Sequence, residues 1–350
     1  MKLVKILPIL LIIVFIFTGC FSEITNGNDK KAENRYSSIN SLDGNESVNL
    51  KKVESWKENK FNKIEYNLSK GRCKLESALI APSYVDKNRI IFVENLEGDD
   101  KVVEFSRNNQ TCKTIYTTEG IGNITGLNGK IYWTEYDTKK YTNVDWKIKS
   151  LDLETNNVTQ IESGGSYKDT PPPTIRTGTN TINWIAYSFK GTELISQVVE
   201  YNCISGKKNQ ISKTTLDESQ RRNGEYYIIQ QGFSDKILIY KSIFDNKGKH
   251  FDISLYHDKT KPKHLLSKDK VIDFSSNDKY FTYTGEGHLT AFDISNPGKE
   301  FVFSTGNFLT TDSPIFINSH TLIFRYGMNE ILIGNLKKGT VYSITGNQEI

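Results

Sequence analysis

The feature that most constrains the fold is a pattern that recurs six times between about residue 80 and the end of the chain. In each repeat, turn residues lead into a short apolar or aromatic run, and two further runs follow. The first runs of the six repeats are Arg89–Val93, Lys130–Trp133, Asn183–Tyr187, Lys236–Tyr240, Lys279–Tyr283 and Thr321–Arg325. The Asp, Asn, Gly and Ser residues before them favour hairpin turns, because they tolerate positive φ or cap the turn with a side chain.

Apolar anchors in the second run of each repeat define the period. Phe105, Leu153, Tyr201, Leu255, Ile294 and Leu336 follow one another at steps of 48, 48, 54, 39 and 42 residues. This period, with several strands per unit and no helical spacing, is typical of a β-propeller. One four-stranded unit cannot bury both of its faces, but six units around an axis can. We therefore expect an all-β chain with six blades in residues 80–350, with five or seven blades as alternatives.

A pair of β-sandwich domains that divide near Pro171-Pro172-Pro173 is the rival fold, but the repeats continue on both sides of that point. Two segments also carry a resemblance. Phe274-Ser275-Ser276-Asn277-Asp278-Lys279-Tyr280-Phe281 resembles the Ser-Pro-Asp-Gly-Lys element of TolB-like propellers, with a degenerate Pro-Asp-Gly. Lys130-Ile131-Tyr132-Trp133-Thr134-Glu135 is similar to the YWTD propeller repeat, with Glu in place of Asp. Together these resemblances cover about residues 80–346, and neither transfers a functional site.

The N-terminal segment predicts export and lipidation. Lys2 and Lys5 precede the apolar run Ile6–Phe17, which has the length of a signal-peptide core and is short for a membrane span. Phe17-Thr18-Gly19-Cys20 resembles the bacterial lipobox, although Leu is usual where Phe17 stands. The resemblance implies cleavage between Gly19 and Cys20, and acylation of the Cys20 thiol. An ordinary cleaved signal and an uncleaved anchor are the alternatives.

These features give a predicted division of the chain. Residues 1–19 are the lipoprotein signal, 20–47 a polar flexible tether, 48–79 an N-terminal extension, and 80–350 the propeller. Within the extension, residues 61–68 fit either a strand that joins a blade or part of a seventh blade. We expect a monomer on the extracytoplasmic face of the cell membrane, held there by lipid on Cys20, since two or three acyl chains give stable binding.

Charge and motifs exclude several functions. The chain after residue 19 has 43 basic and 41 acidic residues, so no basic field is available to attract nucleic acid. The sequence lacks a Gly-X-Ser-X-Gly nucleophile elbow and a calcium loop with alternating Asp; Leu96-Glu97-Gly98-Asp99-Asp100 is interpreted as a solvated hairpin tip. His250, His257 and His264 are spaced by seven residues, which does not bring them to one face of a strand. We expect no metal site, no cofactor and no catalytic residue.

The cysteines and the tryptophans each allow a structural and a functional interpretation. Once Cys20 is acylated, Cys73, Cys112 and Cys203 remain, an odd number that leaves at least one thiol free or paired between chains. Buried, unpaired strand cysteines are the preferred interpretation over a disulfide. Trp133 and Trp184 are expected in the core, whereas Trp146 lies between charged residues and is a candidate for exposure.

The candidate binding element is the loop 163–181, the longest between repeats. It contains Tyr167 and the triplet Pro171-Pro172-Pro173, and a proline triplet holds such a loop extended at low entropic cost. The alternative is that the loop only connects two blades. The sequence thus indicates a non-catalytic module that binds a protein, peptide or glycan. A glycosidase or lyase with carboxylates at the central channel is the alternative function.

Overall fold

The computed structural model describes residues 54–55, 73, 75, 80–95, 99–140, 143–167, 170–178, 180–217, 226–232, 236–245, 248–257, 261–268, 273–277, 279–285, 288–304, 311–327 and 330–343. The chain divides into two units, residues 1–49 and 50–350, and all described residues belong to the second. The predicted signal, Cys20 and the tether therefore lie outside the described residues, as does the segment 61–68. In the part of the chain that is described, no helix is long and apolar enough to cross a membrane.

The described strands form six sheets, each built on four consecutive antiparallel strands. We call these sheets blades 1 to 6 in chain order. Blade 1 contains β2 (Ile80–Val85), β3 (Arg89–Asn95), β4 (Asp100–Ser106) and β5 (Thr111–Thr118). Blade 2 contains β6 (Ile121–Leu127), β7 (Lys130–Glu135), β8 (Asp145–Asp152) and β9 (Val158–Gly165). Blade 3 contains β10 (Arg176–Thr177), β11 (Thr181–Lys190), β12 (Glu193–Asn202) and β13 (Lys208–Leu216).

The second half of the chain repeats the same order. Blade 4 contains β14 (Tyr226–Gly232), β15 (Lys236–Asp245), β16 (Gly248–His257) and β17 (Lys261–Lys268). Blade 5 contains β18 (Asp273–Ser276), β19 (Tyr280–Gly285), β20 (His288–Asp293) and β21 (Asn296–Ser304), and blade 6 contains β22 (Thr311–Phe316), β23 (Thr321–Tyr326), β24 (Glu330–Asn335) and β25 (Thr340–Ser343). A short strand, β1 (Glu54–Ser55), pairs in parallel with β21 at the outer edge of blade 5.

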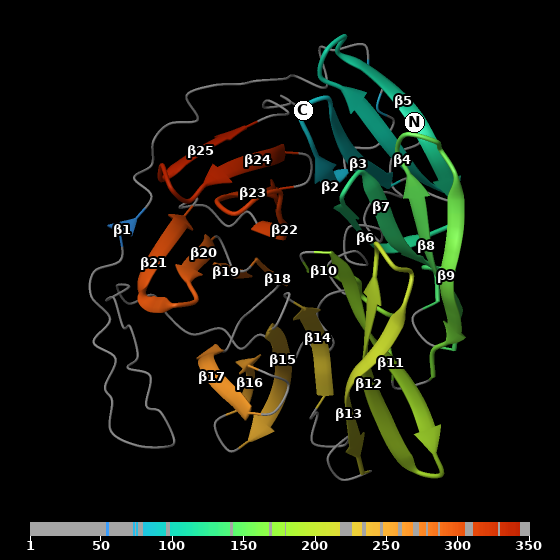
Figure 1. The fold of residues 1–350 in the computed structure, drawn as a ribbon, viewed down its shortest axis with the longest axis vertical. Coiled ribbons are helices and arrows are strands. Elements are labelled where there is room, and N and C mark those ends of the chain that lie inside the picture. The colour runs from blue at the N-terminus through green and yellow to red at the C-terminus, as the bar shows by residue number, and fades with distance from the viewer. Residues whose placement is uncertain are drawn as a thin grey trace, which may run out of the picture. The chain divides into compact units, whose positions relative to one another are not determined.

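The first strand of each blade lies near the centre, and the fourth lies at the periphery (Figure 1). First strands of neighbouring blades contact one another: β2 contacts β6 and β22, β10 contacts β6 and β14, and β18 contacts β22. The expected all-β propeller is confirmed. We call the side on which first strands begin the entry face, and the side on which they end the exit face.

Turn chemistry sets the ends of the strands on the exit face. Asn128 and Gly129 both have positive φ, 51° and 73°, which is the type I′ geometry that joins β6 to β7. In blade 1, Oδ1 of Asp86 accepts hydrogen bonds from the N–H groups of Asn88 and Arg89, and Asn277 caps the same turn of blade 5 in the same way. These described turns therefore lie where the sequence predicted them, whereas Ser234-Asp235 lies outside the described residues.

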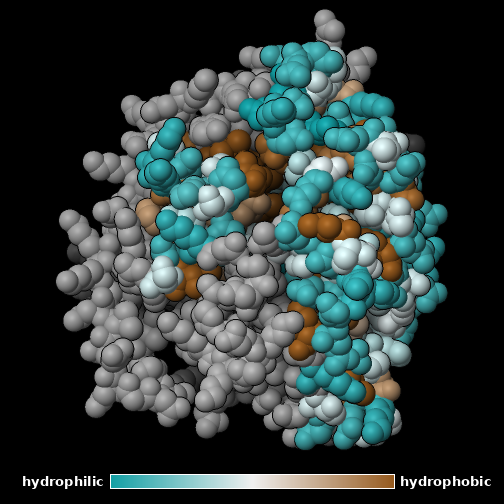
Figure 2. All heavy atoms as spheres, viewed as in Figure 1, coloured by the Kyte–Doolittle hydropathy of each residue, from teal (hydrophilic) through white to brown (hydrophobic). Residues whose placement is uncertain are grey.

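The core consists of apolar clusters between neighbouring blades. Phe92 and Phe105 of blade 1 pack with Ile323 and Ile331 of blade 6, which closes the ring between the first and last blades by side-chain contact. On the face shown in Figure 2, the described surface is mostly hydrophilic, and hydrophobic side chains are visible where blade 6 meets blade 1. Since every described blade uses four consecutive strands, no strand is shared across this seam.

The register corrects one sequence inference. Phe105 and Tyr201 lie within third strands, whereas Leu153, Ile294 and Leu336 come directly after the third strand ends. The anchors are therefore not structurally equivalent, because some lie within the third strand and others directly follow it. The three runs recognised in each repeat are the second, third and fourth strands, and a first strand with a weaker apolar pattern precedes them.

Candidate functional site

The loop between β9 and β10 lies on the entry face and is fixed at its start. The N–H of Ser166 donates to the carbonyl oxygen of Val144 at 2.8 Å, and Oγ of Ser166 accepts the N–H of Val144 at 3.1 Å. Tyr167 and Thr170 then close a small turn, in which the N–H of Tyr167 donates to Oγ1 of Thr170 at 2.8 Å. These hydrogen bonds satisfy backbone groups at the start of the loop.

The second half of the loop is fixed to blade 2. Oγ1 of Thr134, at the end of β7, donates to the carbonyl oxygen of Pro173 at 2.8 Å, and this contact is buried. The N–H of Ile175 donates to Oδ1 of Asn123 in β6 at 2.7 Å. The loop therefore crosses the entry face of blade 2 in a defined path and delivers the chain to the start of β10.

The four predicted loop residues differ in exposure. Tyr167 is 41% exposed, and its ring packs edge-on against Phe189 near the end of β11, with centroids 5.1 Å apart. Pro171 is exposed and Pro172 is half-buried, but Pro173 is buried. Tyr167 and Pro171 therefore offer a rigid aromatic and aliphatic surface, while Pro173 anchors the loop and cannot contact a partner directly.

A charged cluster follows this loop at the centre of the entry face. Arg176, the first residue of β10, forms a buried ion pair with Asp273, the first residue of β18. Oδ1 of Asp273 also accepts the N–H of Phe274 at 2.8 Å, and the Arg176 guanidinium lies 5.4 Å from the centroid of the Phe274 ring. Nε of Arg176 is buried and has no hydrogen-bond partner among the described atoms.

A second pair lies beside the first. Arg325 at the end of β23 holds Asp312 of β22 through two parallel hydrogen bonds, Nε to Oδ1 at 2.8 Å and Nη2 to Oδ2 at 2.5 Å. Burial raises the pKa of Asp273, and the negative charge of Asp312 raises it further, while Arg176 opposes both effects. The first strands β10, β18 and β22 and the second strand β23 thus bring two arginines and two carboxylates together, a set that the sequence analysis did not identify.

A network of polar side chains ties blade 1 to blade 2 beside the loop. Nζ of Lys149 lies 2.6 Å from Oε1 of Glu135, and Oε2 of Glu135 accepts hydrogen bonds from Tyr116 at 2.9 Å and Trp133 at 3.2 Å. Burial would raise the pKa of Glu135, but these three donors outweigh it and hold that pKa below its usual range. The Tyr-Trp-Thr-Glu segment of β7 therefore supports the loop, because its Thr134 binds Pro173.

The cysteine interpretation was wrong for two residues. Cys73 and Cys112 form a disulfide, with their Cα atoms 5.0 Å apart, and it links the segment before β2 to the outermost strand of blade 1. Cys73 is buried in the seam cluster with residues of blades 1 and 6, and the partly buried Cys112 packs against that cluster. Cys203 is the free cysteine of the described chain.

Further sequence expectations have mixed outcomes. Trp133 and Trp184 are fully buried as expected, but Trp146 is only 7% exposed. Its ring covers Gly164 of the neighbouring strand, where an added Cβ would lie 2.5 Å from Cζ2. Asp100 of the predicted solvated tip is also buried. Its Oδ2 accepts a hydrogen bond from the N–H of Ile121 at 2.6 Å, and its Oδ1 accepts one from Nδ2 of Asn95.

No group of three potential metal ligands occurs among the residues that the structure describes. His250 and His257 lie on β16 and His264 on β17, and the side chains of all three lie outside the described part. In the described part of the chain, the entry face has two candidate features, the loop and the charged cluster.

The topology defines the chain as a β-propeller protein, and solved structures are similar to it. TolB from Acinetobacter baumannii shares 14% identity at a TM-score of 0.45, covering 65% of this chain and 55% of its own length. The β-propeller domain of the Trilobed protease from Pyrococcus furiosus shares 13% identity at a TM-score of 0.44 and covers 77% and 85%. An oligogalacturonate lyase in complex with manganese shares 11% identity at a TM-score of 0.40 and covers 70% and 72%. No protein-family profile and no curated protein sequence matches the chain.

Proposed function

We propose that this protein is a lipid-anchored, extracytoplasmic β-propeller that binds a protein or peptide partner on its entry face. The observation that carries the proposal is the loop 163–181, which hydrogen bonds fix in place while Tyr167 and Pro171 stay at the surface. Rigid aromatic side chains give large contact areas at low entropic cost, which favours recognition. The edge-on contact with Phe189 holds the exposed ring of Tyr167 in place, so that little side-chain entropy is lost when a partner binds.

The lipid anchor rests on Gly19-Cys20 after a basic and apolar leader. The disulfide between Cys73 and Cys112 supports export, because such bonds persist in oxidising compartments and are rare in the cytosol. Metabolic labelling with a fatty acid tests the anchor. Wild-type protein should incorporate label and Cys20→Ser should not; equal labelling of the two proteins would refute lipidation.

Binding is tested by crosslinked pulldown from native membranes with Tyr167→Ala as the variant. Ile204→Ala is a matched control, because Ile204 is 76% exposed in the turn between β12 and β13, on the exit face. Partner recovery should fall about tenfold for Tyr167→Ala, the size expected for a buried aromatic anchor, and stay unchanged for the control. Melting temperatures should match throughout. Equal recovery with both variants would remove the loop from the binding site.

A second function, cleavage of a cell-envelope or extracellular glycan, is favoured by one observation. Asp273 and Asp312 lie on neighbouring first strands, and the raised pKa of Asp273 is a property of general acids. Both carboxylates are already held by arginines, which favours binding over catalysis. Turnover of envelope glycans by purified protein, abolished in Asp273→Asn, would support the enzyme and contradict a purely binding role.

A further inference from the structure

One backbone hydrogen bond recurs in five blades. The residue directly after the third strand donates its N–H to the carbonyl oxygen of the residue directly before the second strand. These bonds run from Arg107 to Asn88 (2.8 Å), Leu153 to Gly129 (3.0 Å), Cys203 to Asn180 (2.9 Å), Ile294 to Lys279 (2.8 Å) and Leu336 to His320 (2.8 Å). The five donors therefore occupy equivalent places in their blades, which we call the plug position.

In four of these blades the plug position holds an apolar or weakly polar side chain. Leu153 of blade 2 packs with residues of blade 1, and Leu336 of blade 6 packs with residues of blade 5. Cys203 of blade 3 packs in the same way against blade 2, and Ile294 is buried. Blade 1 differs, because its plug position is Arg107. At the seam between blades 6 and 1, the plug position therefore holds a charged side chain where Leu153 and Leu336 stand at theirs.

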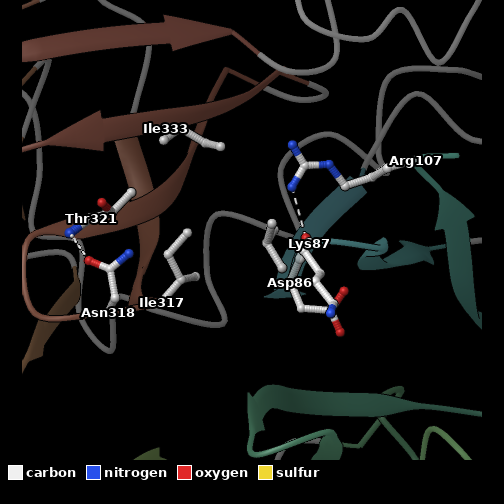
Figure 3. A pocket seen from close by; sticks show the side chains of 8 residues that line it. Asp86, Lys87, Arg107, Ile317, Asn318, Thr321 and Ile333 are labelled. Atoms are coloured by element: carbon white, nitrogen blue, oxygen red, sulfur yellow. Dashed lines mark hydrogen bonds between the residues drawn. The ribbon is translucent and has the colours of Figure 1, made fainter.

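A pocket of about 360 Å³ lies at this seam on the exit face, lined by residues of both blades. Blade 6 contributes Ile317 and Ile333, and Figure 3 shows them across a gap from Arg107, Asp86 and Lys87 of blade 1. Ile333 and Val85 are buried in the seam cluster and Ile317 packs against it, so the inner wall is apolar. The volume falls in the range of small-molecule sites.

Two positively charged side chains and one carboxylate lie at the rim of this seam pocket. Asp86 is already engaged, since its Oδ1 caps the turn and its Oδ2 lies 3.3 Å from Nε of Arg89. Lys87 is exposed, and Arg107 keeps its guanidinium at the pocket by donating from Nη1 to the carbonyl oxygen of Asp86 at 2.8 Å. Two positively charged side chains thus lie beside an apolar wall. This arrangement complements a ligand that has an apolar body and an anionic end.

We propose that the seam pocket binds an apolar group that ends in a carboxylate, from either a free short-chain acid or the C-terminal residue of a peptide. The apolar body takes the place that Leu153 and Leu336 have in their seams, and it packs against Val85, Ile317 and Ile333. The carboxylate accepts hydrogen bonds from Lys87 and Arg107. The site lies on the exit face, so it is independent of the partner-binding loop, and either proposal can fail without the other.

Calorimetric titration of the full chain in nonionic detergent tests the proposal with two probes, 4-methylpentanoate and acetyl-Gly-Gly-Leu. The amide of each probe is its matched control. We expect saturable binding of at least one acid and about tenfold weaker binding of its amide, because a charge-assisted contact is lost. Tighter binding of the acid alone identifies a free acid as ligand, and tighter binding of the peptide identifies a chain end. No saturable binding of either, or equal binding of the amides, would overturn the proposal.

Arg107→Leu gives blade 1 an apolar side chain at the plug position. It tests whether the seam pocket binds the probes specifically. The variant should raise the melting temperature and weaken probe binding at least tenfold. Lys113→Leu removes a charge from an exposed position of β5 in the same blade and should bind as wild type does. Lys87→Gln, an exposed position that leaves the fold intact, should weaken binding several-fold. Wild-type affinity in both pocket variants would contradict the assignment.

Discussion

Arg176 of blade 3 and Asp273 of blade 5 form a buried ion pair, although blade 4 lies between them in the chain. Their side chains are 9% and 7% exposed, so both charges are largely removed from water. Desolvation of two ions is costly, and the pair offsets that cost only while both partners are present. The pair therefore ties the first strands of non-consecutive blades together at the entry face.

Removal of one partner should be more harmful than removal of both. Arg176→Met leaves Asp273 buried without its cation, and we expect a loss of about 3–5 kcal/mol in the free energy of unfolding. Arg176→Met combined with Asp273→Leu should recover much of that loss. Urea denaturation of the three proteins measures both effects, and a double variant as unstable as the single one would show that the pair itself stabilises the ring.

The Glu135 network should give the protein a specific acid sensitivity. The pKa of Glu135 is lowered in the folded state, so its contribution is complete above the ordinary glutamate value of about 4.3 and is lost as pH falls through the folded pKa. The stability difference between wild type and Glu135→Gln should therefore shrink as the pH is lowered from 6 to 3. Denaturation midpoints across that range measure it. A difference that stays constant with pH would mean that ionised Glu135 does not stabilise the contact between blades 1 and 2.

The disulfide should stabilise the seam between the first and last blades. Cys73 and Cys112 are separated by 39 residues, and closing a loop of that length corresponds to roughly 4 kcal/mol in the chain-entropy account. Cys73→Ser with Cys112→Ser should melt at a lower temperature than wild type under oxidising conditions. With a dithiol reductant present, the two proteins should melt close together. An unchanged melting temperature in the double variant would contradict a stabilising role.

Two adjacent glycines give a matched test of packing against Trp146. A Cβ at Gly164 would lie 2.5 Å from Cζ2 of the indole, whereas at Gly165 the nearest atom is 3.7 Å away. Gly164→Ala should therefore cost about 1–3 kcal/mol through overpacking, and Gly165→Ala should cost little. Thermal melts of the two variants measure the contrast. Equal effects would show that the indole moves aside without penalty.

The propeller was predictable because its second, third and fourth strands carry strong apolar runs with turn residues at fixed places. Asn128-Gly129 and the Asx turns at Asp86 and Asn277 formed as expected, since their conformations are set locally. The loop 163–181 was also identified, since its length and proline triplet stand out. Its division into exposed Tyr167 and buried Pro173 was not predictable, because it depends on Thr134 from another strand.

The charged cluster was missed because three of its four members lie on first strands, which have weak sequence signals. β10 is only two residues long and β18 only four, too short for an alternating pattern. Arg176 and Asp273 are also 97 residues apart, so only the closed ring brings them together. The Cys73–Cys112 pairing depends in the same way on how the segment before β2 returns to β5, which spacing alone does not indicate.

The central claim, that a partner binds on the entry face through the loop, is tested most directly by site-specific photocrosslinking in cells. A photoreactive phenylalanine analogue is placed at Tyr167 on the entry face or at Ile204 on the exit face, both of which are exposed. The account predicts a discrete, light-dependent adduct from position 167 and none of that mass from position 204. Adducts of the same mass and yield from both positions, or none from position 167, would contradict it.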